Sequence, residues 1–169
     1  MIYRHQHPAF TLIELLLYVV TSALIIGAIS GLVWLSLQGR VKRQAITEVE
    51  EQGRQAVQII TQSIRNATGV TSPVVGTMGA TLSLSTSQTS TNPTVFNTTS
   101  NAIQMTEGLS AASPLNTAAV KVTNLQFTNL STTLTKNVRL TFTVESNGLS
   151  NRSDYNFQDT FTADAQIRP

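Results

Sequence analysis

The hydrophobic pattern of the chain starts with one long apolar run and continues into a polar segment with helical spacing. The run from Ala9 to Leu37 follows Pro8 and contains a single charged side chain, the carboxylate of Glu14. At about 1.5 Å rise per residue, a helix of this length exceeds the roughly 30 Å thickness of a hydrocarbon core. The run therefore predicts a transmembrane helix. Because a charge inside such a span is costly, Glu14 is a candidate functional residue.

The helical periodicity continues beyond the apolar run. Between residues 38 and 68, apolar or small side chains recur every three or four positions, at Ile46, Val49, Gly53, Val57, Ile60 and Ile64. The opposite face is polar and carries Arg43, Glu50, Glu51, Arg54, Gln58 and Arg65. No proline occurs between Phe10 and Ser72, and Gly69 and Pro73 supply a stop signal. The pattern predicts one helix of roughly 55 to 60 residues, apolar over 10–37 and amphipathic over 38–68.

The pattern changes after Ser72 to short runs with the two-residue period of strands. The predicted strands are Thr81 to Ser85, Ala102 to Thr106, Val120 to Phe127, Val138 to Val144 and, after a turn at Asn147 and Gly148, Tyr155 to Ala165. The Thr/Ser/Asn-rich stretch 85–101 is predicted to be a surface loop. A sheet with one apolar face needs cover, which the stripe from Ile46 to Ile64 can supply. We therefore expect an α+β fold, in which the long helix packs on a small antiparallel sheet domain formed by residues 69–169.

Composition and charge narrow the function classes. The chain has 169 residues, a formal net charge of +2 and no cysteine. A disulfide framework, a thiolate nucleophile and cysteine-ligated metal are therefore excluded. The lysines and arginines are scattered and not interleaved with aromatic residues, so nucleic acid is not indicated as a partner.

Other candidate chemistry is sparse. His5 and His7 lie in the short leader without a third metal ligand, so we expect no metal site there. The five-residue spacing of Asp154, Asp159 and Asp164 fits neither an EF-hand loop nor one face of a strand, which favours a solvating role over calcium. No catalytic triad, phosphate-binding loop or acid–base pair can be assembled. We expect no enzymatic activity, no cofactor and no bound metal.

A specific motif opens the apolar run. A short leader (residues 1–9) ending in the small residue Ala9 is followed by Phe-Thr-Leu-Ile-Glu at 10–14, and this arrangement resembles the class III signal of type IV pilins and pseudopilins. The resemblance implies that a prepilin peptidase cleaves between Ala9 and Phe10, that the new amine of Phe10 is methylated, and that Glu14 serves filament assembly. The family usually has glycine at the position of Ala9. The implied partners are other pilin or pseudopilin subunits, the prepilin peptidase, the inner-membrane assembly platform and membrane lipid.

Two further segments are similar to minor pilins and minor pseudopilins. They are the helical positions Arg54, Ala56, Val57, Ile60, Ile64, Arg65, Asn66 and Ala67, and the strand core Val122, Leu125 and Phe127. The resemblance covers type IV pili, type II secretion pseudopili and DNA-uptake filaments. Within the apolar run, Ala23, Gly27 and Gly31 form a ladder of small residues that permits close helix packing, although glycine is also simply tolerated in membrane helices.

The charges that flank the span and the resemblance disagree about orientation. Arg40, Lys42 and Arg43 follow the span whereas only Arg4 precedes it, which favours a cytoplasmic C-terminal part. The resemblance implies a single-pass protein of the bacterial cytoplasmic membrane whose C-terminal domain is extracytoplasmic and which later joins a filament in the periplasm or at the cell surface. Our interpretation follows the resemblance. The alternatives are an uncleaved, single-span, membrane-anchored extracytoplasmic binding protein, and a membrane-tethered hydrolase that would need the missing catalytic set.

Overall fold

A single long helix forms the N-terminal part of the chain. The computed structural model describes residues 11–147 and 157–168, and helix α1 spans Leu12–Asn66, 55 residues. This length confirms the prediction of one uninterrupted helix. The chain divides into two compact units, with the boundary between Val41 and Lys42.

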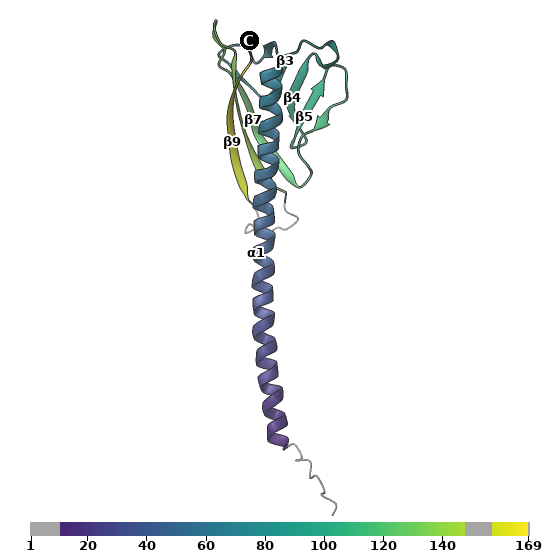
Figure 1. Cartoon of the computed structure of the whole chain (residues 1–169), viewed down its shortest axis with the longest axis vertical. Helices are drawn as coiled ribbons and strands as arrows, with labels where there is room; N and C mark the ends of the chain where they lie inside the picture. Colours follow the sequence, from purple (N-terminus) through teal and green to yellow (C-terminus); the bar gives the residue numbers. More distant parts are fainter. Residues whose placement is uncertain (1–10, 148–156, 169) are drawn as a thin grey trace, which may run out of the picture. The chain divides into compact units, whose positions relative to one another are not determined.

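The second unit adds two antiparallel sheets to the C-terminal half of α1, so the α+β fold class is confirmed. The first sheet has the strand order β1-β3-β4-β5-β6 and the second has the order β2-β7-β8-β9. In Figure 1, β7 and β9 lie on one side of this half of α1, and β4 and β5 lie on the other. The strands are β1 (Gly69–Ser72), β2 (Met78–Gly79), β3 (Leu82–Ser85), β4 (Thr94–Thr99), β5 (Ala102–Glu107), β6 (Ser113–Pro114), β7 (Val120–Asn129), β8 (Asn137–Ser146) and β9 (Gln158–Gln166), with a short 3-10 helix, η1 (Thr89–Thr91).

One hydrophobic core joins the helix to both sheets. The buried helix residues Val49, Ala56, Ile60 and Ile64 belong to the same cluster as Leu82, Leu84, Phe96 and Ile103 of the first sheet and Phe127, Leu140 and Phe142 of the second. The predicted stripe on α1 is therefore the covering face of the domain, with Ile46 and Val57 half-buried at its margins. Burial of these side chains supplies the main driving force for folding of this unit.

An irregularity in β7 explains how its apolar residues all reach the core. The pairing with β8 shifts between Thr123 and Gln126, and Asn124 there has a positive φ of 53°. Strict alternation from Val122 would turn Leu125 toward solvent. The extra residue of the bulge restores the inward direction, so both side chains are buried.

The prediction of a surface loop over 85–101 is wrong for its second half. Residues Thr94–Thr99 form β4, which pairs with β5 along its whole length, from Thr94 opposite Glu107 to Thr99 opposite Ala102. Phe96 is fully buried and anchors this strand in the core. The β-branched threonines around it favour extended backbone, so the segment forms a strand with only one large buried side chain. Ser100 and Asn101, with φ values of 53° and 61°, form the two-residue turn of this hairpin.

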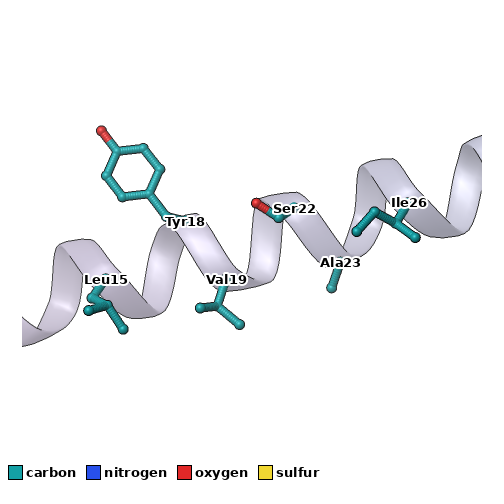
Figure 2. Close-up of a pocket in the computed structure, with 6 residues that line it drawn as sticks. All are labelled: Leu15, Tyr18, Val19, Ser22, Ala23 and Ile26. Carbon is teal, nitrogen blue, oxygen red and sulfur yellow. The ribbon is translucent and has the colours of Figure 1, made fainter.

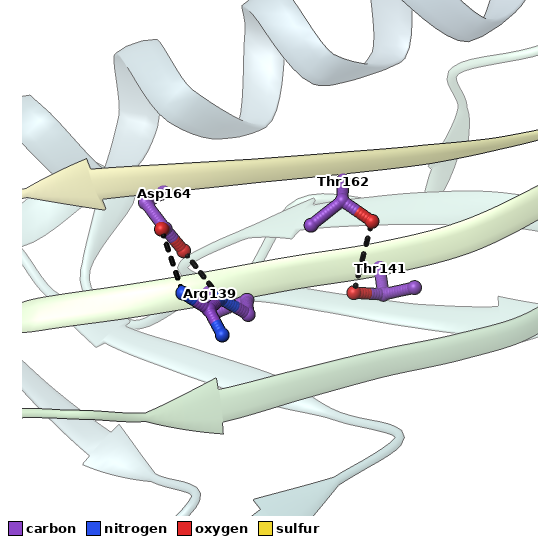
Figure 3. Close-up of polar contacts among 4 residues, drawn as sticks. All are labelled: Arg139, Thr141, Thr162 and Asp164. Atoms are coloured by element: carbon purple, nitrogen blue, oxygen red, sulfur yellow. Dashed lines mark hydrogen bonds and ion pairs between the residues drawn. The ribbon is translucent and has the colours of Figure 1, made fainter.

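The pair β8–β9 carries a polar ladder on its exposed face. Arg139 donates hydrogen bonds from Nε and an Nη to the two oxygens of Asp164, at 2.8 and 3.0 Å (Figure 3). The hydroxyls of Thr141 and Thr162 lie 3.5 Å apart, the next pair along this ladder. The hydrogen bonds from Arg139 hold the pKa of the Asp164 carboxyl below its ordinary value, so the pair is charged at neutral pH.

At Gly53 the backbone of α1 lies close to the ring of Phe161 in the second sheet. A Cβ at this position would overlap Cε2 and Cζ of Phe161, whose ring stacks on Phe142 with centroids 5.5 Å apart. Gly53 therefore lets the aromatic pair lie against the helix backbone.

We expect Gly53→Ala to destabilise the domain although alanine is the better helix former. Forcing extra atoms into a packed core costs about 1 to 3 kcal/mol, whereas the gain in helix propensity is about 1 kcal/mol. In a Phe161→Ala background the overlap is gone, so the same substitution should become stabilising by up to about 1 kcal/mol. Urea unfolding of the four chains of this cycle measures the change of sign. Equal effects of Gly53→Ala in both backgrounds would contradict the packing argument.

Candidate functional site

The first unit contains the segment that fits a membrane. Leu12–Ser36 is 25 residues long with a mean hydropathy of 2.3, and none of it is buried within the chain. One N-terminal helix is therefore long and apolar enough to cross a bilayer as a single-pass anchor. An isolated soluble helix would not expose this much apolar surface, so the segment needs an apolar environment outside its own chain.

The start of α1 defines a local environment for Glu14. The backbone N–H of Glu14 donates to Oγ1 of Thr11 at 3.4 Å, and that of Leu15 donates to the Thr11 carbonyl at 3.1 Å. Thr11 is thus the N-cap, and Glu14 occupies the third helical position, where a carboxylate is favoured by the helix dipole. The sequence signal for this cap, Thr-x-x-Glu at 11–14, was available but was not part of the prediction for Glu14.

Two hydroxyl groups of the span, those of Thr21 and Ser30, are satisfied by the helix itself. Thr21 Oγ1 donates to the carbonyl oxygens of Leu17 and Tyr18 at 2.9 and 3.1 Å, and Ser30 Oγ donates to that of Ile26 at 2.8 Å. Such bonds make hydroxyls compatible with lipid or with an apolar helix bundle. Glu14 is the only charged residue between Thr11 and Ser36, so its carboxylate is the polar group of the span that is most costly to leave unpaired in an apolar environment.

The surface of this helix has an apolar groove of about 620 Å³. Its lining residues are Leu15, Tyr18, Val19, Ser22, Ala23 and Ile26. Figure 2 shows the short side chains of Ser22 and Ala23 among the larger ones that line the groove with them. A second helix could seat a large side chain in such a groove, in the manner of ridges packing into grooves.

Two of the predicted small residues, Gly27 and Gly31, have no close neighbour in the described part of the chain. A Cβ added at Gly27 or Gly31 would meet no atom within 4 Å, so no close approach inside the described structure requires glycine at either position. At 100° per residue, Ala23 lies about 180° around the helix from Glu14, and Gly27 and Gly31 lie about 140° and 100° from it on the same side. The structure therefore places the carboxylate and the small residues on different faces.

The remaining predicted residues divide into two groups. Ala9, Phe10, His5, His7 and Asp154 lie outside the described residues. Asp159 is exposed and Asp164 pairs with Arg139, so they do not converge. Within residues 11–147 and 157–168, no three His, Asp or Glu side chains come together closely enough to hold a metal ion.

Comparisons of the chain with protein-family models, with curated proteins and with solved structures found no match. The fold alone defines the class of protein: a small α+β domain whose helix also carries an apolar segment of membrane length. The function of the chain is therefore argued from its candidate site.

Proposed function

We propose that the chain is a minor pilin or minor pseudopilin, a structural subunit of a type IV filament. In this proposal the chain is inserted in the bacterial cytoplasmic membrane, cleaved between Ala9 and Phe10 by a prepilin peptidase and methylated at Phe10. It is then assembled with other subunits through α1, while the two-sheet domain faces outward. The filament is a type IV pilus, a type II secretion pseudopilus or a DNA-uptake filament.

The observation that carries the proposal is the continuity of α1 with the Phe-Thr-Leu-Ile-Glu motif. The helix begins within that motif, at Leu12, and continues without a break to Asn66. Its apolar part is unburied, Gly27 and Gly31 in that part meet no described neighbour, and its later part covers the sheets. A helix that serves first in lipid and later in a bundle of like helices has use for all of these features.

The principal alternative is an uncleaved membrane-anchored extracytoplasmic binding protein. The membrane-length segment alone fits that function equally well, because an anchor needs only apolar length. The two functions differ in the chemistry of the N-terminus.

Mass analysis of the N-terminal peptide from the membrane fraction of the native host tests the proposal. We expect a peptide that starts with N-methyl-phenylalanine at position 10. The Ala9→Trp variant, whose bulky side chain should block the peptidase, provides the control and should retain the leader. An intact Met1 on the mature wild-type chain would refute the proposal and favour the anchored binding protein.

A further inference from the structure

A pocket with an all-cationic set of charges lies at the C-terminal end of α1. Its volume is about 760 Å³, and it is formed by the end of the helix, the segment before β8 and the segment after β9. Among the residues that the structure describes, the charged ones that line it are Arg65, Lys136 and Arg168, and no Asp or Glu is among them. Thr68, Thr135 and Gln166 add neutral polar groups.

Backbone hydrogen bonds join the three segments that carry these cations, although the segments are far apart in the sequence. The N–H of Arg168 donates to the carbonyl of Arg65 at 3.3 Å, and that of Ile167 donates to the carbonyl of Lys136 at 3.0 Å. The Lys136 ammonium in turn donates to the Thr68 carbonyl at 2.7 Å. The fold therefore brings three positively charged residues to one hollow, where an anion would be attracted by all three.

The carboxylate of Asp164 is engaged by Arg139, which does not line the pocket. Asp164 lines an adjoining pocket of about 490 Å³ together with Arg65 and Arg168. Both of its oxygens accept hydrogen bonds from Arg139, as Figure 3 shows. The ion pairs found in the described part of the chain are Arg139–Asp164 and Arg54–Glu50, and neither includes a cation of the pocket.

Stabilisation of the C-terminus of α1 explains only part of the reason why three cations gather there. Cations near a helix C-terminus offset its negative dipole, and Lys136 uses one of its three N–H donors in this way. The carbonyls of Arg65 and Thr68 are already occupied by the hydrogen bonds described above, which removes acceptors that would repel an anion. Arg65 and Arg168 are exposed, so their planar donor groups remain accessible to a ligand.

We propose that this pocket binds a compact oxyanion with several negative charges, carried by phosphate or sulfate groups. Arginine forks match phosphate and sulfate oxygens in a bidentate manner, and the lysine contributes a further charge. The pocket favours a compact ligand over a polymer because the other cations described nearest along α1 and on β7 are paired or lie apart from it. Arg54 pairs with Glu50, and Lys121 faces Glu145 at the opposite end of β8. The proposal concerns the second unit alone and does not depend on filament assembly.

Isothermal titration of the full chain in non-ionic detergent micelles with sodium tripolyphosphate tests this proposal. At low ionic strength we expect saturable one-site binding that added salt weakens. Arg65→Gln and Arg168→Gln should each reduce the affinity about tenfold, because each removes a charge-assisted donor pair. Lys136→Arg keeps the positive charge but changes the group that contacts the Thr68 carbonyl. It should retain binding, because the charge and not this contact contributes to the affinity.

Arg54→Gln is the matched control, because it changes the net charge of the same helix by the same amount outside the pocket. It should leave the affinity within about twofold. The proposal is overturned if tripolyphosphate gives no saturable binding, or if Arg54→Gln weakens it as much as Arg65→Gln. If a single-stranded oligonucleotide binds more tightly than tripolyphosphate, and both Arg54→Gln and Lys121→Gln weaken its binding, the ligand is an extended polyanion. That result would also overturn the proposal of a compact oxyanion.

Discussion

Ile60→Ala should destabilise the two-sheet domain by about 2 to 5 kcal/mol, the range for deleting a large aliphatic side chain from a core. Ile60 has no exposed surface and lies in the cluster that joins α1 to both sheets. The substitution leaves a cavity at that junction, and alanine supports the helix, so loss of helix propensity plays no part. Since a domain of this size is stable by only about 5 to 15 kcal/mol, the loss is a large share of the total.

Proteolysis of the full chain in micelles at increasing urea concentrations measures this effect, because the protease cleaves the unfolded fraction. Ile59→Ala is the matched control: the same chemical change, one position along the same helix, at a half-buried side chain. Its cost should be clearly smaller because less apolar surface is lost from the core. Equal losses at the two positions would mean that the helix does not cover the sheets with the face described.

The sequence predicted those elements in which a periodic apolar pattern and burial coincide. In β8, Val138, Leu140, Phe142 and Val144 alternate strictly, and all four are buried. Thr94–Thr99 escaped prediction because Phe96 is its only fully buried large side chain, and its pairing with β5 is set by tertiary contacts and a two-residue turn. The division of the strands into two sheets could not be predicted either. The alternation of apolar residues shows which face of a strand is buried, but it does not show which strand pairs with it.

The candidate site residues also divide into those that local spacing predicts and those that only tertiary contacts bring together. The spacing of Glu14 and Ala23 contains the information that they lie on opposite sides of a helix, because only the helical period is needed. Thr11 was likewise identifiable as a cap from its spacing to Glu14. The cationic pocket was not predictable, because Arg65, Lys136 and Arg168 come from three segments distant in the sequence that only the folded domain brings together.

The position of Glu14 gives it two separable roles. As the third residue of α1 it favours the helix N-terminus, a contribution of at most about 1 kcal/mol at an exposed site. As the only charge of the apolar segment it is also the group that, in the proposed filament, neutralises the amine of Phe10 on a neighbouring subunit. Glutamine keeps the size and hydrogen-bonding capacity of this side chain and removes its charge, so it loses the second role together with a dipole contribution of at most about 1 kcal/mol.

We therefore expect Glu14→Gln, like Glu14→Ala, to leave cleavage and methylation intact but to abolish incorporation into filaments. An unpartnered charge in an apolar bundle costs about 3 to 5 kcal/mol, which corresponds to at least a hundredfold loss of incorporation. The measurement compares the variant in the membrane and sheared-filament fractions of a host lacking the wild-type copy. Thr21→Ala, on the same helix face two turns further along, is the control and should assemble normally, because its hydroxyl bonds only to its own helix. Normal incorporation of processed Glu14→Gln would reduce Glu14 to a helix cap, since the carboxylate charge would then have no part in assembly.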